Sequence, residues 1–156
     1  MIKIIQEHEH APVLYGLKKT NYVRMKKSFE IEMKVRDYEC DAQGIVNNAN
    51  YLHYFENTRH EFMYSLGITF KESLLMKIIP VVVRADLRYQ TSLTGGDVFI
   101  SSLTVERIGV KIFFYQTIYR KSDNALCCKA TIEVAILVNG KPSRGDVFDE
   151  KLKDYL

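Results

Sequence analysis

The chain has 156 residues, of which 47% are hydrophobic and 26% are charged, and its formal net charge is +3. This length fits one domain that buries about two thirds of the surface its unfolded chain exposes. The basic residues are scattered among acidic ones, which argues against a nucleic-acid partner. No apolar stretch approaches the roughly 20 residues of a membrane span, so we expect no membrane partner either.

The three cysteines, Cys40, Cys127 and Cys128, make an odd count, and a domain of this size needs no disulfide. We therefore expect a reducing, cytoplasmic location. The adjacent Cys127 and Cys128 should point to opposite faces of a strand. Cys40 has no histidine close in sequence to activate its thiol, so we interpret it as a packed residue rather than a nucleophile.

Residues 1–27 show no clean hydrophobic period, and we interpret them as an N-terminal extension before a single domain of residues 28–156. Either Met25 is the true initiator, or the extension is ordered and caps a sheet edge or a partner subunit. From Phe29 to Val35, apolar and charged residues alternate, which predicts a half-buried strand.

A long helix is predicted from about Asn48 to Leu66, because apolar residues recur there at helical spacing. Asn47 or Asn48 can cap its start, and Gly67 can end it. At a rise of 1.5 Å per residue the helix is about 28 Å long, enough to cross a sheet. A second, short helix is predicted over residues 69–76.

Four strands are predicted after the helices, over about 79–89, 98–108, 110–121 and 126–138, and then a short terminal helix over 148–156. Turn residues separate the strands, and the short connections predict consecutive antiparallel hairpins. A sheet with one apolar face needs a cover, which the long helix can provide. The expected fold class is therefore α+β.

The polar loop between the first strand and the long helix carries the candidate chemistry. Asp41 lies a few residues before the helix start, where unpaired backbone N–H groups and the helix dipole favour negative charge. A carboxylate base or nucleophile beside such an oxyanion-stabilising dipole suits attack on an activated carbonyl. Alternatively, Asp41 only shapes the loop through an Asx turn.

Three segments around the helix start form a motif: DAQGIVNNANY from Asp41 to Tyr51, YFE from Tyr54 to Glu56, and RHE from Arg59 to Glu61. This motif resembles the 4-hydroxybenzoyl-CoA thioesterase group of hotdog-fold acyl thioesterases, and it is similar also to plant acyl-carrier-protein thioesterases. The resemblance spans about residues 28–145. It implies a curved antiparallel sheet wrapped around a long central helix. It also implies hydrolysis of an acyl-CoA or acyl-carrier-protein thioester without a metal or cofactor.

The resemblance also implies roles for single residues. Asp41 would attack the thioester carbon or activate the water that does so, and the backbone N–H of Asn48 would bind the carbonyl oxygen. The resemblance leaves open the acyl group, the choice between CoA and carrier protein, and the choice between nucleophile and base. The expected catalytic residues are Asp41 and Asn48, and the expected substrate-binding residues are Gly44, Val46, Asn47 and Tyr51.

His53, Glu56 and His60 share one helical face. They lack a complete ligand set at a known zinc spacing, so we predict a polar or subunit-facing stripe and no metal site. Arg59 and Glu61 are expected to fix the helix by ion pairs or to lie near the site entrance. Basic residues on the predicted strands could hold CoA phosphates, namely Arg84, Arg88, Lys111, Arg120 and Lys121.

One helix on one sheet leaves a side of the helix uncovered and a sheet edge open, so we predict a homodimer or homotetramer with the site between subunits. Two other functions remain open. A hotdog hydratase or dehydratase would want a histidine where Val46 and Asn47 stand. A noncatalytic acyl-thioester binding module would use Asp41 only to shape the loop.

Overall fold

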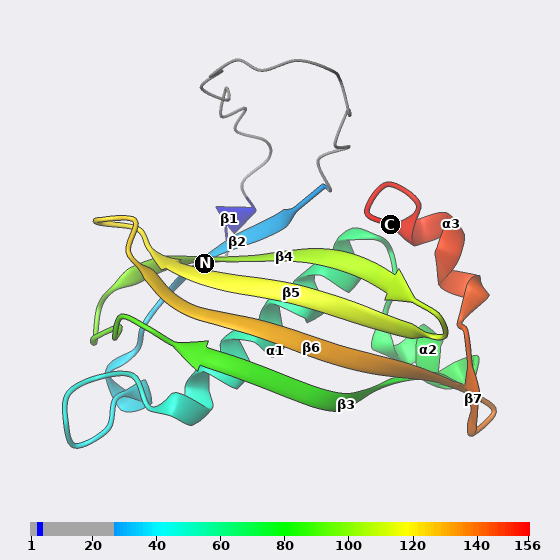
Figure 1. The fold of residues 1–156 in the computed structure, drawn as a ribbon, viewed down its shortest axis with the longest axis horizontal. Helices are drawn as coiled ribbons and strands as arrows, with labels where there is room; N and C mark the ends of the chain where they lie inside the picture. The colour runs from blue at the N-terminus through cyan, green and yellow to red at the C-terminus, as the bar shows by residue number, and fades with distance from the viewer. Residues whose placement is uncertain (1–2, 5–26) are drawn as a thin grey trace, which may run out of the picture.

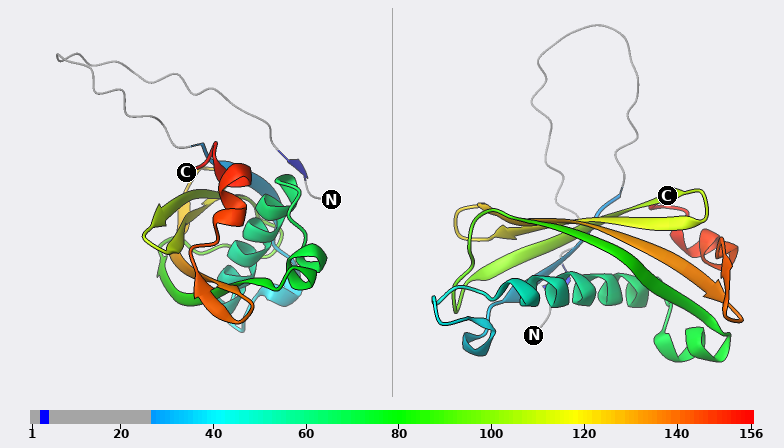
Figure 2. Two further views of the ribbon diagram at one scale, coloured as in Figure 1. Left: turned by 90° about the vertical axis from the view of Figure 1, so that its right-hand side faces the viewer. Right: turned by 60° about the horizontal axis from the view of Figure 1, so that its bottom comes forward.

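The computed structural model describes residues 3–4 and 27–156 and consists of one antiparallel sheet curled around a long helix, α1 (Asn48–Ser65) (Figure 1). Figure 2 shows α1 lying along the hollow of the sheet, with the short helix α2 (Phe70–Leu75) beyond its end. This arrangement confirms the α+β class and the expected wrapping of a central helix. The strands are β1 (Lys3–Ile4), β2 (Phe29–Lys34), β3 (Ile78–Tyr89), β4 (Val98–Ile108), β5 (Lys111–Arg120), β6 (Leu126–Val138) and β7 (Lys141–Ser143).

The strand order is β1-β2-β4-β5-β6-β3, and β7 pairs with β6. The predicted hairpins are confirmed for β4, β5 and β6, but the prediction that β3 and β4 are neighbours is wrong. The amides of Gln90 and Thr91 still donate to carbonyls of the strand β6, so β3 follows β6 to its end. The connection then buries Leu93, while β2 occupies the free edge of β4.

The core lies between the inner face of the sheet and one face of α1. Along β4, buried and half-buried residues alternate from Val98 to Glu106, as expected for a strand with one covered face. Phe55 and Phe62 of α1 are fully buried, and the Phe62 ring lies 5.5 Å from that of Phe29. Burial of each large apolar side chain stabilises the fold by roughly 2–3 kcal/mol.

The sequence predicts that Cys127 and Cys128 face opposite sides of the sheet. This prediction is wrong, because β6 contains a bulge. Ile118 pairs with Cys128 and Tyr119 pairs with Leu126, which leaves Cys127 as an extra residue. Both thiols are therefore buried. Alternation along a strand holds only where the register is unbroken.

The ends of the elements differ slightly from the predictions. α1 ends at Ser65, one residue before the predicted Leu66, and Gly67 follows with a left-handed φ of 67°. Nζ of Lys151 donates to the carbonyl of Gly67 at 2.8 Å. Of the terminal helix predicted over residues 148–156, only α3 (Asp149–Leu152) is α-helical, and a single 3₁₀ turn, Asp146–Phe148, precedes it.

The predicted N-terminal extension of residues 1–27 lies mostly outside the described residues. Lys3 and Ile4 pair antiparallel with Glu32 and Ile31 at the outer edge of β2. The role of the extension stays a prediction. Among the described helices, none combines the length and apolar character that crossing a membrane requires.

Candidate active site

The loop between β2 and α1 closes on itself directly before the helix. A 3₁₀ turn, Asp37–Glu39, leads into a narrow hairpin in which Cys40 pairs with Val46. The amide of Asp41 donates to the carbonyl of Ile45 at 2.9 Å, and the amide of Asn47 donates to the carbonyl of Glu39 at 2.9 Å. These bonds hold Asp41 across the hairpin from the residues that enter α1.

Asp41 shapes the loop, as one of the two alternatives from the sequence expects, and the catalytic alternative stays a prediction. Its Oδ1 accepts from the amide of Gln43 at 2.8 Å, so the residue does form an Asx turn. Among the described residues, no donor is bonded to Oδ2 and no cation pairs with the carboxylate. One oxygen therefore shapes the loop while the other is available to accept a proton.

Gly44 lies at the exposed tip of this hairpin and has a φ of 78°. A Cβ at this position would meet no atom within 4 Å, so the glycine is required by backbone conformation rather than by space. Its amide donates to the carbonyl of Asp41 at 2.9 Å. The conformation of Gly44 thus helps to fix the orientation of Asp41.

The first turn of α1 leaves one amide open. Oδ1 of Asn47 caps the helix by accepting from the amide of Ala49 at 3.0 Å. The amide of Asn50 donates to the carbonyl of Asn47 at 2.9 Å. Within the described part of the chain, no acceptor is bonded to the amide of exposed Asn48. This N–H can stabilise a developing negative oxygen, because it stands at the positive end of the helix dipole.

Tyr51 and Val46 anchor the loop rather than line an open surface. Both are buried, and both bond to Leu93, whose carbonyl accepts from the amide of Val46 and whose amide donates to the hydroxyl of Tyr51 at 3.3 Å. Burial raises the pKa of Tyr51 to about 12, so its hydroxyl is neutral. The substrate-binding role expected of Gly44, Val46, Asn47 and Tyr51 stays a prediction.

Glu39 is a supporting residue that the sequence analysis did not identify. Its buried carboxylate accepts from the amide of Arg36 at 2.7 Å and from the hydroxyl of Tyr54 at 2.8 Å. Burial, followed by the hydrogen bond to Glu39, raises the pKa of Tyr54. The spacing of Arg36 and Glu39, three residues apart, was the available sequence signal. This network ties the loop to α1.

A cavity of about 200 Å³ lies at the far end of α1, away from this loop. Glu56, Arg59, His60, Thr69 and Ser73 give it a polar side. Its apolar side is formed by Met63, Ile68, Phe70, Pro80, Val82, Ile112, Phe114, Val134, Ile136, Phe148 and Leu152. Within one subunit, the structure therefore does not bring the predicted catalytic residues to this cavity.

The polar stripe of α1 places two histidines close to one carboxylate. Glu56 lies 3.9 Å from Nδ1 of His53 and 3.8 Å from Nε2 of His60. Burial lowers the pKa of His60 below its ordinary value. Arg59 does not form the expected ion pair with any described residue, and its Nη1 donates instead to Oε1 of Gln116 at 2.8 Å.

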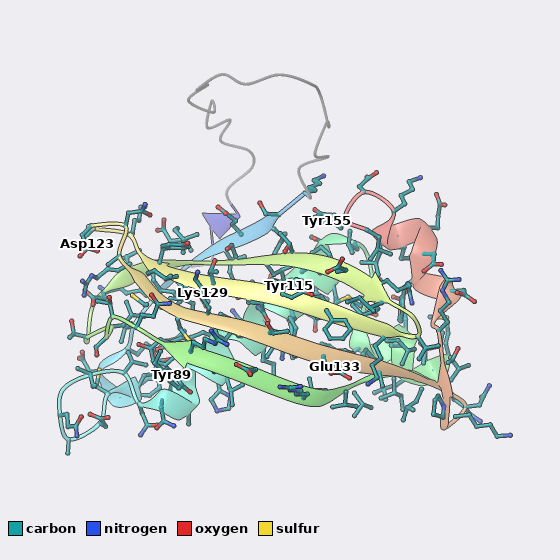
Figure 3. The ribbon with its side chains drawn as sticks, viewed as in Figure 1. Tyr89, Tyr115, Asp123, Lys129, Glu133 and Tyr155 are labelled. Atoms are coloured by element: carbon teal, nitrogen blue, oxygen red, sulfur yellow. The ribbon has the colours of Figure 1, made fainter. Side chains whose placement is uncertain are left out.

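The basic residues considered for CoA phosphates all have acidic neighbours. Asp86 lies 3.7 Å from Arg84 and 4.0 Å from Arg88, and both arginines are largely exposed. The other three pairs are Lys111 with Glu133, Arg120 with Asp123, and Lys121 with Glu32. Figure 3 shows Glu133 and Asp123, the partners of Lys111 and Arg120, at separate places on the molecule.

Comparisons with known proteins agree with this fold. The family profile described as the thioesterase-like superfamily matches residues 35–156. The chain therefore belongs to the thioesterase-like superfamily.

Individual relatives carry related names. The chain is 38% identical over 92 residues to the acyl-acyl carrier protein thioesterase ATL2 of Arabidopsis thaliana; the match covers 58% of this chain and 49% of that protein. It is 29% identical over 119 residues to the acyl-CoA thioesterase YbgC of Haemophilus influenzae, covering 75% and 86%. The chain thus spans about half the length of the plant relative.

A solved structure of an Aquifex aeolicus protein superimposes with a TM-score of 0.73 at 29% identity, covering 82% of this chain and 99% of that chain. Both chains share the wrapped-helix architecture over nearly the whole of the smaller one. The family and the hotdog fold expected from the motif are confirmed.

Proposed function

We propose that this protein is an acyl thioesterase that hydrolyses an acyl-CoA or acyl-carrier-protein thioester to a free acid and a thiol. The observation that carries the proposal is the open amide of Asn48, which stands beside a hairpin that holds the Asp41 carboxylate. The names of the relatives support this class of substrate. Two different names leave CoA and carrier protein as the two candidate thiols.

In the base-catalysed route, the free oxygen of Asp41 accepts a proton from water as the water oxygen bonds to the thioester carbon. The carbonyl oxygen becomes negative and is stabilised by the amide of Asn48. The carbon–sulfur bond then breaks, and the proton on Asp41 passes to the leaving thiolate. In the nucleophilic route, Asp41 itself attacks the carbon, the carbon–sulfur bond breaks and the thiolate leaves. Water then hydrolyses the resulting anhydride, which releases the acid, restores the Asp41 carboxylate and supplies the proton that the thiolate takes up. A general base contributes about 10²- to 10⁴-fold, and an oxyanion donor about 10²- to 10³-fold.

The proposal includes a homodimer formed along β3. This strand is at the end of the sheet order, and Val82 and Val83 near its centre are 49% and 51% exposed. A long, apolar, unpaired edge is unfavourable in water and pairs readily with a second strand. A two-fold axis would pair β3 with itself, because an isologous contact uses the same surface on both subunits.

This dimer would complete the site. In an antiparallel pair of β3 strands, the Tyr89 end of one strand lies beside the Ile78 end of the other. The hydroxyl of Tyr89 donates to the carbonyl of Asn48 at 3.1 Å, whereas Pro80 and Val82 line the cavity. The cavity of one subunit would therefore face the helix start of its partner, and the acyl group would pass from one subunit into the other.

The proposal is tested by replacing Asp41 with Asn and measuring thiol release from a panel of acyl-CoA esters. We expect kcat to fall at least about 10²-fold because the proton acceptor is lost. Asp37→Asn is the matched control, since Asp37 is an exposed acid of the same loop, and its turnover should be unchanged. A folded Asp41→Asn protein with full turnover contradicts the role of Asp41. Tight acyl-CoA binding by the native protein without any thiol release would favour a noncatalytic binding module.

A further inference from the structure

The cavity between α1, α2 and the sheet contains an arginine that has almost no partners. Nη1 of Arg59 donates to Oε1 of Gln116, whose Nε2 in turn donates to the carbonyl of Phe55 at 3.0 Å. Gln116 is buried and neutral, so it orients the guanidinium without balancing its charge. Among the described residues, no other acceptor is bonded to Arg59, although a guanidinium carries five N–H donors.

The remaining N–H groups of Arg59 face open space rather than packed protein. Within the described part of the chain, the side-chain nitrogen that is fully buried without an acceptor belongs to Arg107. Arg59 is half-buried and lines the cavity, so its free donors are reached from the cavity. Burial lowers the pKa of Arg59, because removal from water disfavours the charged form of the guanidinium.

The other charged groups of the cavity lie at its rim. Glu56 is about half-exposed, and its two oxygens point to His53 and His60. His60 is predominantly neutral at pH 7, because burial lowers its pKa. Glu56 raises the pKa of Arg59 only as the smaller effect, after the opposing effect of burial. A half-buried cation that lines a mostly apolar cavity, without a carboxylate bonded to it, favours an anionic oxygen group from a ligand.

The volume of the cavity limits what the ligand can be. A dry apolar cavity of about 150 Å³ binds benzene, so the 200 Å³ here holds roughly six carbon atoms and a small polar group. Its walls are mostly apolar, which suits a short chain or a single ring.

We propose that this cavity receives the acyl part of the substrate and that Arg59 selects acyl groups with a carboxylate at the end remote from the thioester. This inference rests on the proposed function, because it names the acyl class for that same site. Arg59 is a specificity residue here and takes no part in bond cleavage. An acyl group that lacks the carboxylate would leave the guanidinium desolvated and unpaired.

The experiment compares two CoA esters of equal carbon number, adipoyl-CoA and hexanoyl-CoA. In the native protein we expect kcat/KM to be at least about 10-fold higher for adipoyl-CoA. Arg59→Gln should lower kcat/KM for adipoyl-CoA by about 10- to 100-fold and change that for hexanoyl-CoA by less than about threefold. Arg59→Lys should keep part of the preference, since it keeps the charge. Arg144→Gln, which removes an exposed arginine outside the cavity, should leave both values unchanged.

A second measurement does not depend on hydrolysis. Adipate added to the protein labelled with ¹⁵N-arginine should shift the Nε–H resonance of Arg59, whereas hexanoate should not. If both esters are hydrolysed equally well and adipate causes no shift, the inference is overturned while the thioesterase proposal stands. If adipate shifts the resonance but no acyl-CoA or acyl-carrier-protein thioester of a panel is hydrolysed, the cavity assignment stands and the thioesterase proposal fails. Equal losses with both esters in Arg59→Gln would reduce Arg59 to a structural role and overturn the inference.

Discussion

Gly44 shows how a single backbone conformation controls the candidate site. It adopts a left-handed φ at the loop tip, and its amide donates to the carbonyl of Asp41. Because the space around it is empty, a substitution there changes the backbone preference and little else. The position of Asp41 should therefore be sensitive to this one residue.

We predict that Gly44→Ala lowers the free energy of unfolding by about 1 kcal/mol, because alanine disfavours positive φ, and also lowers kcat. Gly96→Ala is the matched control: Gly96 has a φ of 84° and equally open surroundings, but it lies in a different turn. Urea unfolding and thiol release measure the two effects. If both variants lose the same free energy of unfolding and have the same turnover, Gly44 has no specific effect on the candidate site.

At the scale of the helix, Asn47 connects the stability of α1 with its chemistry. Its side chain caps the first turn, next to the open amide of Asn48. Aspartate caps a helix as well as asparagine does, but it adds a negative charge at the position where the thioester oxygen becomes negative.

Asn47→Asp should therefore leave the free energy of unfolding within about 0.5 kcal/mol of the native value and lower kcat. Asn47→Ala should cost about 1 kcal/mol, since it removes the cap. The idea of an oxyanion at the helix start fails if Asn47→Asp is stable and retains full turnover.

The elements could be predicted to different degrees, for physical reasons. The bounds of β4 and β6 followed from their strand patterns and the turn residues that flank them, and the start of α1 followed from a local cap. The partner of β3 could not be predicted, because Tyr89 pairs with Cys128, which lies far along the chain. The bulge at Cys127 was also hidden, since register is set by the neighbouring strand.

The candidate site divides in the same way. Asp41, Gly44 and Asn48 lie within eight consecutive positions, so one loop-helix motif was enough to nominate them. The cavity around Arg59 is lined by residues of α1, α2, β3, β5 and β6. These elements are distant in sequence, so no local pattern predicts the cavity. Arg59 was expected to form an ion pair or to lie near the site entrance. It forms no ion pair with a described residue, because Gln116, remote in sequence, lies beside it and accepts from it, and its place near the site entrance stays a prediction.

At the scale of the whole molecule, a site shared between subunits predicts complementation. Asp41→Asn and Arg59→Gln proteins, each slow with adipoyl-CoA, would form hybrid dimers after mixing, unfolding and refolding. One site of each hybrid has an intact Asp41 and an intact Arg59 from different subunits. Activity should then rise to about a quarter of the native value, because half of the dimers are hybrids with one good site each.

The control is a mixture of Asp41→Asn with the double variant Asp41→Asn/Arg59→Gln. It should restore no activity, because neither subunit has an intact Asp41. Sedimentation of the same samples establishes whether dimers form. Dimers without recovery would indicate that Asp41 and Arg59 of one subunit serve the same site, and a stable monomer would exclude the β3 pairing.

The neighbouring thiols of β6 have a practical consequence. Burial raises the pKa of both, to about 12 for Cys128, so little reactive thiolate exists while the sheet is closed. A thiol reagent should label half-buried Cys40 first and these two only as the sheet opens. The rate of the slow phase of labelling would thus report the rate at which the sheet opens around its central helix.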